Sequence, residues 1–392
     1  MASVIKRINE FNAEIPEYLR HIKWKAMEES AFRFYRGTAH IFAQDFIKLY
    51  KYKPKIRTWI CGDLHFENFG SYKGDNRQEY FDLNDFDESI LASPEPEIAR
   101  FLTCIIIAAN EMKASALNIH KTLHVVMEEY ITTIINRKAL MLEEKIAHGA
   151  FKKYFEQLND TNRTEFLQKR TEKHKGHLKL ITDGKHFLPL EDSKKADIYN
   201  SISILLSESE NFSHFIFEDA AFRIAGTGSL GLERYCILFF SKKKGKNYLI
   251  DIKETRKSCF ANLIDIKQPE FTNEAIRINT VRNIMQFNSP AFISTITINN
   301  KQFVVQELQP LSNKMAISDF GTDFGMFGEV AKEMARLIAY SHLRSSGNYG
   351  SSTVDDLQKF ASKKQWQRDI IELSAVMAKK NDKYYKQFLK AE

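Results

Sequence analysis

Residues 62–68, with the sequence GDLHFEN, combine an aspartate and an asparagine at a spacing that suits phosphoryl transfer. In phosphotransferases one carboxylate orients or deprotonates the attacking hydroxyl, and a nearby amide oxygen ligates Mg²⁺. Asp63 and Asn68 are the candidates for these roles, because a turn after a strand can point both side chains at one place. His65 belongs to the same catalytic candidate and could stiffen the loop through a backbone hydrogen bond. Taken alone, this pattern more often marks an Asx-rich turn without chemistry.

A second acidic segment, residues 82–88, has the sequence DLNDFDE and carries four carboxylates within seven positions. Such a density of like charges is costly unless a cation lies among them. Mg²⁺ prefers one or two carboxylates together with phosphate oxygens and water, so Asp85 is the candidate metal ligand and Asp87 its support. A solvated acidic turn is the alternative, but the neighbouring Phe81 and Phe86 argue for burial.

A glycine-rich segment lies between two strand-like runs further along the chain. Its sequence is GTGSLG, and its candidate phosphate-binding members are Gly226, Thr227, Gly228, Ser229 and Gly231. The residues that follow are β-branched and aromatic rather than helical, which favours a kinase-type nucleotide lid over a dinucleotide-binding turn. A β-hairpin turn without function is the alternative.

Lys253 ends the third strand of this block, where a kinase lid carries the lysine that faces the α- and β-phosphates. The expected helix after it begins with Glu274, a candidate partner that could hold Lys253 in place. Taken alone, the lysine is better interpreted as a surface residue.

Taken together, these motifs are the components of ATP- and Mg²⁺-dependent phosphoryl transfer. Their order is unusual, because the catalytic loop precedes the lid by about 160 residues. Two D-F-G triplets, at Asp319 and Asp323, follow the lid, but no matching catalytic loop lies between them and Lys253. Since a helical pattern begins directly after them, we expect a loop and a helix N-cap there.

The composition is that of an ordinary globular protein. The chain has 392 residues, 43% apolar and 27% charged, which excludes wholesale disorder, collagen and a pure coiled coil. A net charge of +7 is compatible with a phosphate-bearing ligand, whereas nucleic-acid binders usually concentrate their charge more. Four cysteines without a C-x-x-C pair and an N-terminus without an apolar signal segment predict a cytoplasmic protein with no membrane span. Signal-independent export would leave the same sequence.

Hydrophobic spacing predicts a helix-rich part, then five strands with one helix, then more helices. Helices are expected over residues 1–30, most of 96–209, 273–286, 327–343 and 355–389. Strands are expected over residues 57–61, 78–83, 221–225, 233–240, 247–253, 292–298 and 302–308.

Motifs over most of the chain resemble those of the DUF2252 family of bacterial proteins, which is grouped with the protein-kinase-like fold. The matching segments keep one order: FYRG at 34–37, CGDLHFENFG at 61–70, FDLNDFDE at 81–88, RIAGTGSLG at 223–231, IKE at 252–254, VQEL at 305–308 and ARLIAYSH at 335–342. The G-D-x-H-x-x-N segment is also similar to that of aminoglycoside and choline phosphotransferases. This resemblance implies that Asp63 is the catalytic base, Asn68 and Asp85 are metal ligands, and Lys253 is the phosphate lysine.

The resemblance also implies an α+β, two-lobed protein-kinase-like fold with a circularly permuted chain order. Residues 1–210 and 310–392 would form the larger helical lobe, and residues 211–309 a small β-rich lobe inserted into it. Residues 306–309 would be the hinge, where Glu307 and Leu308 offer backbone groups to adenine.

The chain departs from the family pattern in two places. Residues 279–281 read NTV, where the family tends to have a glutamate that could pair with Lys253. A protein-kinase activation segment is also missing after Asp87, which leaves little platform for an extended peptide and favours a small or unusual acceptor.

Three further polar residues have two interpretations each. Arg36 either places its guanidinium near phosphate or forms a structural salt bridge with the acidic cluster. His342 and Arg344, near a helix end, are better interpreted as packing and capping groups than as functional ones.

The leading hypothesis is a phosphotransferase that uses ATP and Mg²⁺ and passes the γ-phosphate to an unidentified hydroxyl acceptor, a small molecule or a protein. A nucleotidyltransferase that transfers AMP, and a non-catalytic nucleotide-binding pseudokinase, are alternatives on the same fold. Nucleic-acid binding is not expected from the sequence, because only the mild positive charge and the lysine-rich turns support it.

Overall fold

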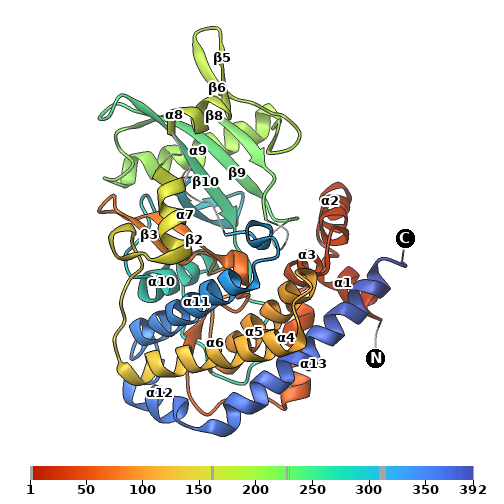
Figure 1. The fold of residues 1–392 in the computed structure, drawn as a ribbon. Coiled ribbons are helices and arrows are strands. Elements are labelled where there is room, and N and C mark those ends of the chain that lie inside the picture. The colour runs from red at the N-terminus through yellow and green to blue at the C-terminus, as the bar shows by residue number, and fades with distance from the viewer. Residues whose placement is uncertain (1–2, 160–162, 227, 229, 309–314, 392) are drawn as a thin grey trace.

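The computed structural model describes residues 3–159, 163–226, 228, 230–308 and 315–391. It is a mixed α+β structure in which a β-rich part lies above a larger helical part, as Figure 1 shows. Segments from both ends of the chain build the helical part, and the β-rich part comes from the middle. The α+β class predicted from the sequence is therefore confirmed.

Helices near both ends of the chain form the helical part. They are α1 (Val4–Phe11), α2 (Glu17–Glu28), α3 (Ala31–Gly37), α4 (Ala39–Tyr50), α5 (Glu95–Glu111), α6 (Ala116–Asn136), α7 (Gly149–Asn159), α11 (Phe324–Ser345), α12 (Val354–Ala361) and α13 (Lys364–Phe388). Two small two-stranded antiparallel sheets lie among them and pair β1 (Thr58–Ile60) with β4 (Ile90–Ala92) and β2 (Phe69–Lys73) with β3 (Glu79–Leu83). The first acidic loop connects β1 to β2, and the second connects β3 to β4.

The β-rich part is a six-stranded antiparallel sheet in the order β11-β12-β10-β9-β8-β7. Its strands are β7 (Phe187–Leu188), β8 (Phe215–Arg223), β9 (Arg234–Ser241), β10 (Lys246–Glu254), β11 (Ser294–Ile298) and β12 (Lys301–Glu307). Three further elements accompany it: α8 (Arg163–Gln168), the projecting hairpin of β5 (Thr171–His174) with β6 (His177–Leu180), and α9 (Asp192–Glu208).

The boundary predicted between residues 210 and 211 is too late in the chain. Strand β7 already pairs with β8, and Ile198 and Ile202 of α9 pack in the apolar core under the sheet. The cause is the segment 163–208, which is expected from the sequence to be mostly helical but also contains the strands β5, β6 and β7, and whose helix α9 packs on the sheet.

Alternation along β10 decides what the sheet presents to the rest of the molecule. Tyr248, Ile250 and Ile252 pack into the core on one face. Because side chains of a strand alternate between faces, Asp251 and Lys253 lie on the other face, and both line the cavity described below.

Helix α10 (Glu274–Met285) connects the two parts. Asn273 caps its N-terminus by accepting a hydrogen bond from the backbone of Ile276 at 2.9 Å. Its residues Ile278 and Val281 are fully buried in the core of the helical part. The helix is thus fixed to the lower part while it lies beside the sheet.

In the described part of the chain, no helix combines the length and the apolar character needed to cross a bilayer.

Candidate functional site

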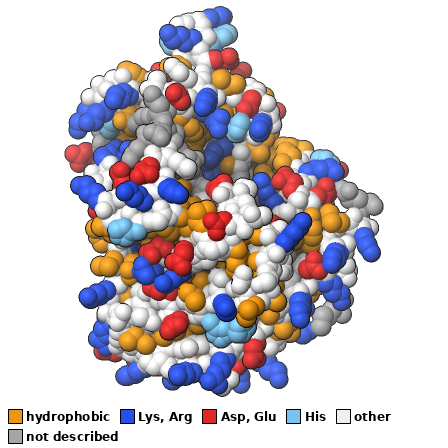
Figure 2. Space-filling view, in the orientation of Figure 1, with side chains coloured by type: hydrophobic (Ala, Val, Ile, Leu, Met, Phe, Trp, Pro, Cys, Tyr) orange, Lys and Arg blue, Asp and Glu red, His pale blue; other side chains and the backbone are white. Residues whose placement is uncertain are grey.

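A cavity of about 220 Å³ lies where the sheet meets the helical part. Its walls come from α1, the α3–α4 junction, the two acidic loops, the strands β8 to β10 and the end of β12. Basic side chains lie within this hollow in Figure 2. The predicted catalytic loop and the predicted lid therefore face one space, although they are far apart in the sequence.

A tight turn after β1 presents Asp63 to the cavity. Gly62 has a φ of +82°, and a side chain there would collide with the backbone carbonyl of Glu88. Glycine is required for both reasons, and this fixes the direction in which Asp63 leaves the strand.

Asp63 is held by a buried cation. Nε of Arg100, on α5, donates to Oδ1 of Asp63 at 2.7 Å, and Arg100 is fully buried. Burial raises the pKa of Asp63 to about 6, against the opposing charge of Arg100. A carboxyl with a pKa near neutrality is suited to accept a proton from a hydroxyl.

The rest of the catalytic loop is fixed by its own hydrogen bonds. The side-chain amide nitrogen of Asn68 donates to the backbone carbonyl of Asp63, which leaves the amide oxygen as the atom that can ligate a cation. The backbone N–H of Asn68 donates to the carbonyl of His65 at 2.9 Å. This main-chain bond closes the turn of the loop, and His65 lines the cavity.

Arg36 lines the cavity and forms an ion pair with Glu67 of the catalytic loop. Its Nε also lies 3.3 Å from Nε2 of His65. The salt-bridge interpretation thus describes Arg36, but its partner is in the first acidic loop rather than the 82–88 cluster.

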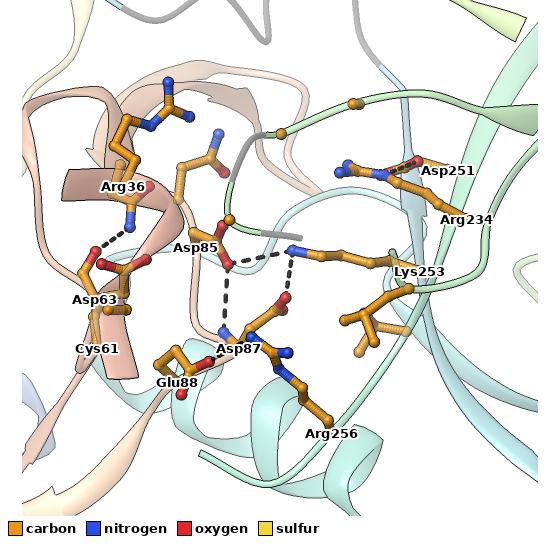
Figure 3. Close-up of a pocket in the computed structure, with 18 of the residues that line it drawn as sticks. Arg36, Cys61, Asp63, Asp85, Asp87, Glu88, Arg234, Asp251, Lys253 and Arg256 are labelled. Atoms are coloured by element: carbon orange, nitrogen blue, oxygen red, sulfur yellow. Dashed lines mark hydrogen bonds and ion pairs between the residues drawn. The ribbon is translucent and has the colours of Figure 1, made fainter. Parts of the chain in front are cut away.

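Lys253 reaches from β10 to the second acidic loop, as Figure 3 shows. Its Nζ lies 3.6 Å from Oδ1 of Asp85 and forms a closer ion pair with Asp87. Burial raises the pKa of Asp87, while the charge of Lys253 opposes the shift. The ammonium therefore holds the two carboxylates together.

The donors Asn68 and Asp85 fit a magnesium ion by their chemistry. The backbone N–H of Asn84 donates to the carbonyl of Asn68 at 2.8 Å, so the two loops are joined beside Asp85. Among the described residues, no three His, Cys, Asp or Glu side chains are grouped to hold a metal. Oxygen ligands from a phosphate and from water would have to complete the shell, which is how Mg²⁺ is commonly bound.

The glycine-rich segment lies in the loop between β8 and β9 and descends onto the catalytic loop. Gly226 and Gly228 line the cavity, and a Cβ on Gly228 would lie 3.7 Å from Oδ2 of Asp63. Gly231 has a φ of +109° and packs against Ile15. Thr227 and Ser229 lie outside the described residues.

The N-terminal helices hold this loop down. Nζ of Lys23, on α2, donates to the carbonyl of Gly228 at 3.3 Å and to Oδ1 of Asn12 at 2.9 Å. Burial lowers the pKa of Lys23 to about 7, and the charge of Arg256 adds to the effect. The N-terminal residues therefore cover one side of the cavity.

Charged residues line the sheet side of the cavity. Asp251 is 1% exposed and forms ion pairs with Arg223 at 2.6 Å and with Arg234 at 2.5 Å. Burial alone would raise the pKa of Asp251, yet the two guanidiniums lower it far below its usual value. This rigid charged group lies two residues before Lys253 on the same face of β10.

The pairing predicted for Glu274 is wrong. Its carboxylate pairs with Arg277 at 2.6 Å, one turn along α10, and Glu274 does not line the cavity. The acids that hold Lys253 come from the 85–87 loop instead.

The hinge prediction is only partly compatible with the structure. Glu307 and Leu308 line the cavity, as expected. However, the N–H of Leu308 donates to the carbonyl of Leu249 at 2.7 Å, and that of Glu307 donates to Ala291 at 3.4 Å. These two donors are therefore already used, and residue 309 lies outside the described residues.

The D-F-G triplets and the C-terminal polar residues are structural. Asp323 is the N-cap of α11 and accepts from the backbone of Met326 at 2.9 Å, and Asp319 lies in a short 3-10 turn. His342 hydrogen-bonds Glu97 at 2.7 Å, and Arg344 pairs with Asp82 at 2.7 Å.

Several residues that line the cavity are not among the candidates from the sequence, and neither is Arg100, which holds Asp63. Arg100 carried a signal, because it is the single charged residue in the apolar run 98–109 and a buried charge needs a partner. Asp251 carried another, since it shares a strand face with Lys253. Nothing in the sequence pointed to Phe11 and His40, whose stacked rings line the cavity from distant segments.

Comparison with models of protein families gives a match over nearly the whole chain. The family model DUF2252, described as "Uncharacterized protein conserved in bacteria", matches residues 15–391 of the chain. No curated protein and no solved structure matches it.

Proposed function

The chain belongs to the DUF2252 family, and we propose that it is a phosphotransferase that uses ATP and Mg²⁺ and transfers the γ-phosphate to a hydroxyl acceptor. One observation carries this proposal. Asp63, Asn68, Asp85, Lys253 and the glycine-rich loop line a single cavity, although about 190 residues separate the first from the lysine. A structural role for each motif separately would not require them to meet.

Each residue has a defined task in this scheme. Asp63 accepts the proton of the acceptor hydroxyl, and Arg100 fixes the direction of its carboxylate. Lys253 binds phosphate oxygens, and the backbone of the loop at Gly228 covers them. Asn68 and Asp85 would hold the metal ion, which supplies neutralisation of the phosphate charge when bound.

The cavity must open for this ligand. Its volume of about 220 Å³ is below the ~300–1,000 Å³ of typical ligand sites, and Gly228 rests beside Asp63. We therefore assign the described arrangement to a closed state in which Lys253 occupies the region between the carboxylates. Opening requires the lid loop to leave the catalytic loop.

A non-catalytic nucleotide-binding protein is the second candidate. The observation that favours it is that Lys253 pairs with Asp85 and Asp87 and not with an acid on α10. Such a protein would bind the nucleotide in the same cavity without turnover.

Transfer of a label from ATP tests this proposed function. The purified protein is incubated with Mg²⁺, a bacterial metabolite extract and ATP labelled at either the γ- or the α-phosphate. We expect γ-label on a metabolite, abolished in Asp63→Asn and kept in the control Asp319→Asn, which lies outside the cavity. Transfer of α-label would show nucleotidyl transfer instead, and binding without either label would favour the non-catalytic candidate.

A further inference from the structure

Arg282, on α10, is a buried cation that lines the cavity and forms no ion pair with the described residues. It is 4% exposed, and within the described chain its Nε and Nη1 atoms have no hydrogen-bond partner. Its guanidinium lies 5.7 Å from the centre of the Phe86 ring, in the second acidic loop. Buried guanidinium groups are normally paired, because an unsatisfied buried charge is costly.

Three carboxylates lie near Arg282, but other cations hold them. Burial lowers the pKa of Arg282, and the charges of Asp87, Asp85 and Asp251 oppose this shift, in that order. Lys253 binds the first two, and two arginines of the sheet bind the third. Arg282 is therefore a cation kept near an acidic pair that is directly bound by Lys253 and not by Arg282.

The backbone around Arg282 is fixed to the same acidic loop. Arg277, a little more than one turn earlier on α10, donates to the carbonyl of Asp87 at 2.9 Å and to Oγ of Ser89 at 2.8 Å. It also donates to the carbonyl of Arg256 at 3.2 Å. Because α10 and the 85–89 loop are tied together, a change of partner near Asp87 needs only side-chain movement.

The Lys253 ammonium contacts Asp85 and Asp87 at the same time. When it turns to phosphate oxygens, as the proposed function requires, its charge is shared between the phosphates and Asp87, whose side chain is only 15% exposed. A metal ion held by Asp85 would neutralise that carboxylate but would leave Asp87 with only this shared counter-charge. Weakening the counter-charge of a buried carboxylate is unfavourable.

We propose that Arg282 is a positioning residue that takes over Asp87 when Lys253 moves to the phosphates of the bound nucleotide. This inference rests on the proposed function and explains why a guanidinium is kept unpaired in the closed state. It also gives α10 a role towards Lys253 although no acid of this helix pairs with that lysine. Through Arg282, the helix would free Lys253 from Asp87.

The proposal predicts opposite effects on stability and on binding. Replacing Arg282 by methionine removes an unpaired buried charge, so the melting temperature of the ligand-free protein should equal or exceed that of the wild type. The affinity for Mg²⁺ with a non-hydrolysable ATP analogue should fall about tenfold or more, because Asp87 then competes for Lys253. A merely structural arginine would give a lower melting temperature and an unchanged affinity.

The experiment measures melting temperature and calorimetric affinity for Mg²⁺ with the imido analogue of ATP, using the full chain. Arg282→Lys keeps the charge and should recover part of the affinity. Arg336→Met is the matched control, since Arg336 is paired with Glu129 and Glu333 outside the cavity and should lose stability but not affinity.

A double-mutant cycle identifies the partner. In an Asp87→Asn background, Arg282→Met should no longer change the affinity, because the carboxylate to be neutralised is gone. An equal loss in both backgrounds, or wild-type affinity in Arg282→Met, would overturn the inference. Absence of binding by the wild type would instead overturn the proposed function, and this inference with it.

Discussion

Asp63 combines a fixed orientation with a raised proton affinity. Because burial raises its pKa to about 6, a base at this position loses its charge as the pH falls through that value. We expect kcat/KM to fall by about tenfold per pH unit below pH 6. The measurement is a pH profile of ATP turnover between pH 5 and pH 8. The same acidic limb should remain in His65→Gln, and its disappearance there would assign the titration to the histidine.

Lys23 should make the fold more stable as the pH rises above 7. Its pKa is lowered to about 7 in the folded state, so between pH 7 and the ordinary lysine range the unfolded chain binds more protons. Lys23 therefore raises the free energy of unfolding as the pH rises, by up to about 1.4 kcal/mol per pH unit. Lys23→Met should remove that slope between pH 7 and pH 9, as urea unfolding would measure. A slope unchanged from wild type would show that Lys23 is charged when folded.

At the scale of elements, the turn that presents Asp63 depends on one glycine. Gly62→Ala would force a left-handed residue and a collision with the backbone of Glu88, so we expect a loss of more than about 2 kcal/mol in the free energy of unfolding. Gly176→Ala is the control, because Gly176 has a φ of +85° but open space around it. It should lose about 1 kcal/mol from the backbone conformation alone. Equal losses in the two variants would show that the contact with Glu88 can relax.

The N-cap of α11 distinguishes a structural D-F-G triplet from a functional one. Asp323 accepts a backbone hydrogen bond at the start of a 22-residue helix and lies outside the cavity. Asp323→Ala should lower the free energy of unfolding by about 1 kcal/mol and leave nucleotide affinity unchanged. Chemical denaturation and calorimetry measure the two quantities. If Asp323→Ala instead lost nucleotide affinity at unchanged stability, this D-F-G triplet would be the metal-binding one.

The elements with a local signal are those that the sequence predicted well. Strands β9 to β12 alternate or run apolar, and α10 carries a clear N-cap, so the predicted ranges agree with the structure within a few residues. Strand β8 begins six residues before its predicted range, and β7 lies in a region predicted to be mostly helical. The segment 163–208 was misplaced, because its helical pattern does not record which part of the molecule it packs against. The same limit hid Arg282, since its importance comes from carboxylates that are about 195 and 197 residues away along the chain.

At the scale of the whole molecule, the site exists only because two parts of the chain meet. The β-rich part brings Lys253 and the glycine-rich loop, and the helical part brings Asp63 and Asp85 (Figures 1 and 3). Residues 4–28 add a cover that contacts the lid through Lys23. A ligand that bridges the two parts should therefore stabilise the entire fold and not one element.

Thermal denaturation with ATP tests this most directly. With Mg²⁺ and ATP at about a hundred times the dissociation constant, mass action should stabilise the wild type by about 2.7 kcal/mol and raise its melting temperature. The rise should depend on Mg²⁺, and it should vanish in Lys253→Met and in Asp85→Asn but persist in Asp319→Asn. A wild type whose melting temperature does not respond to ATP and Mg²⁺, or a full response in Lys253→Met, would contradict the account.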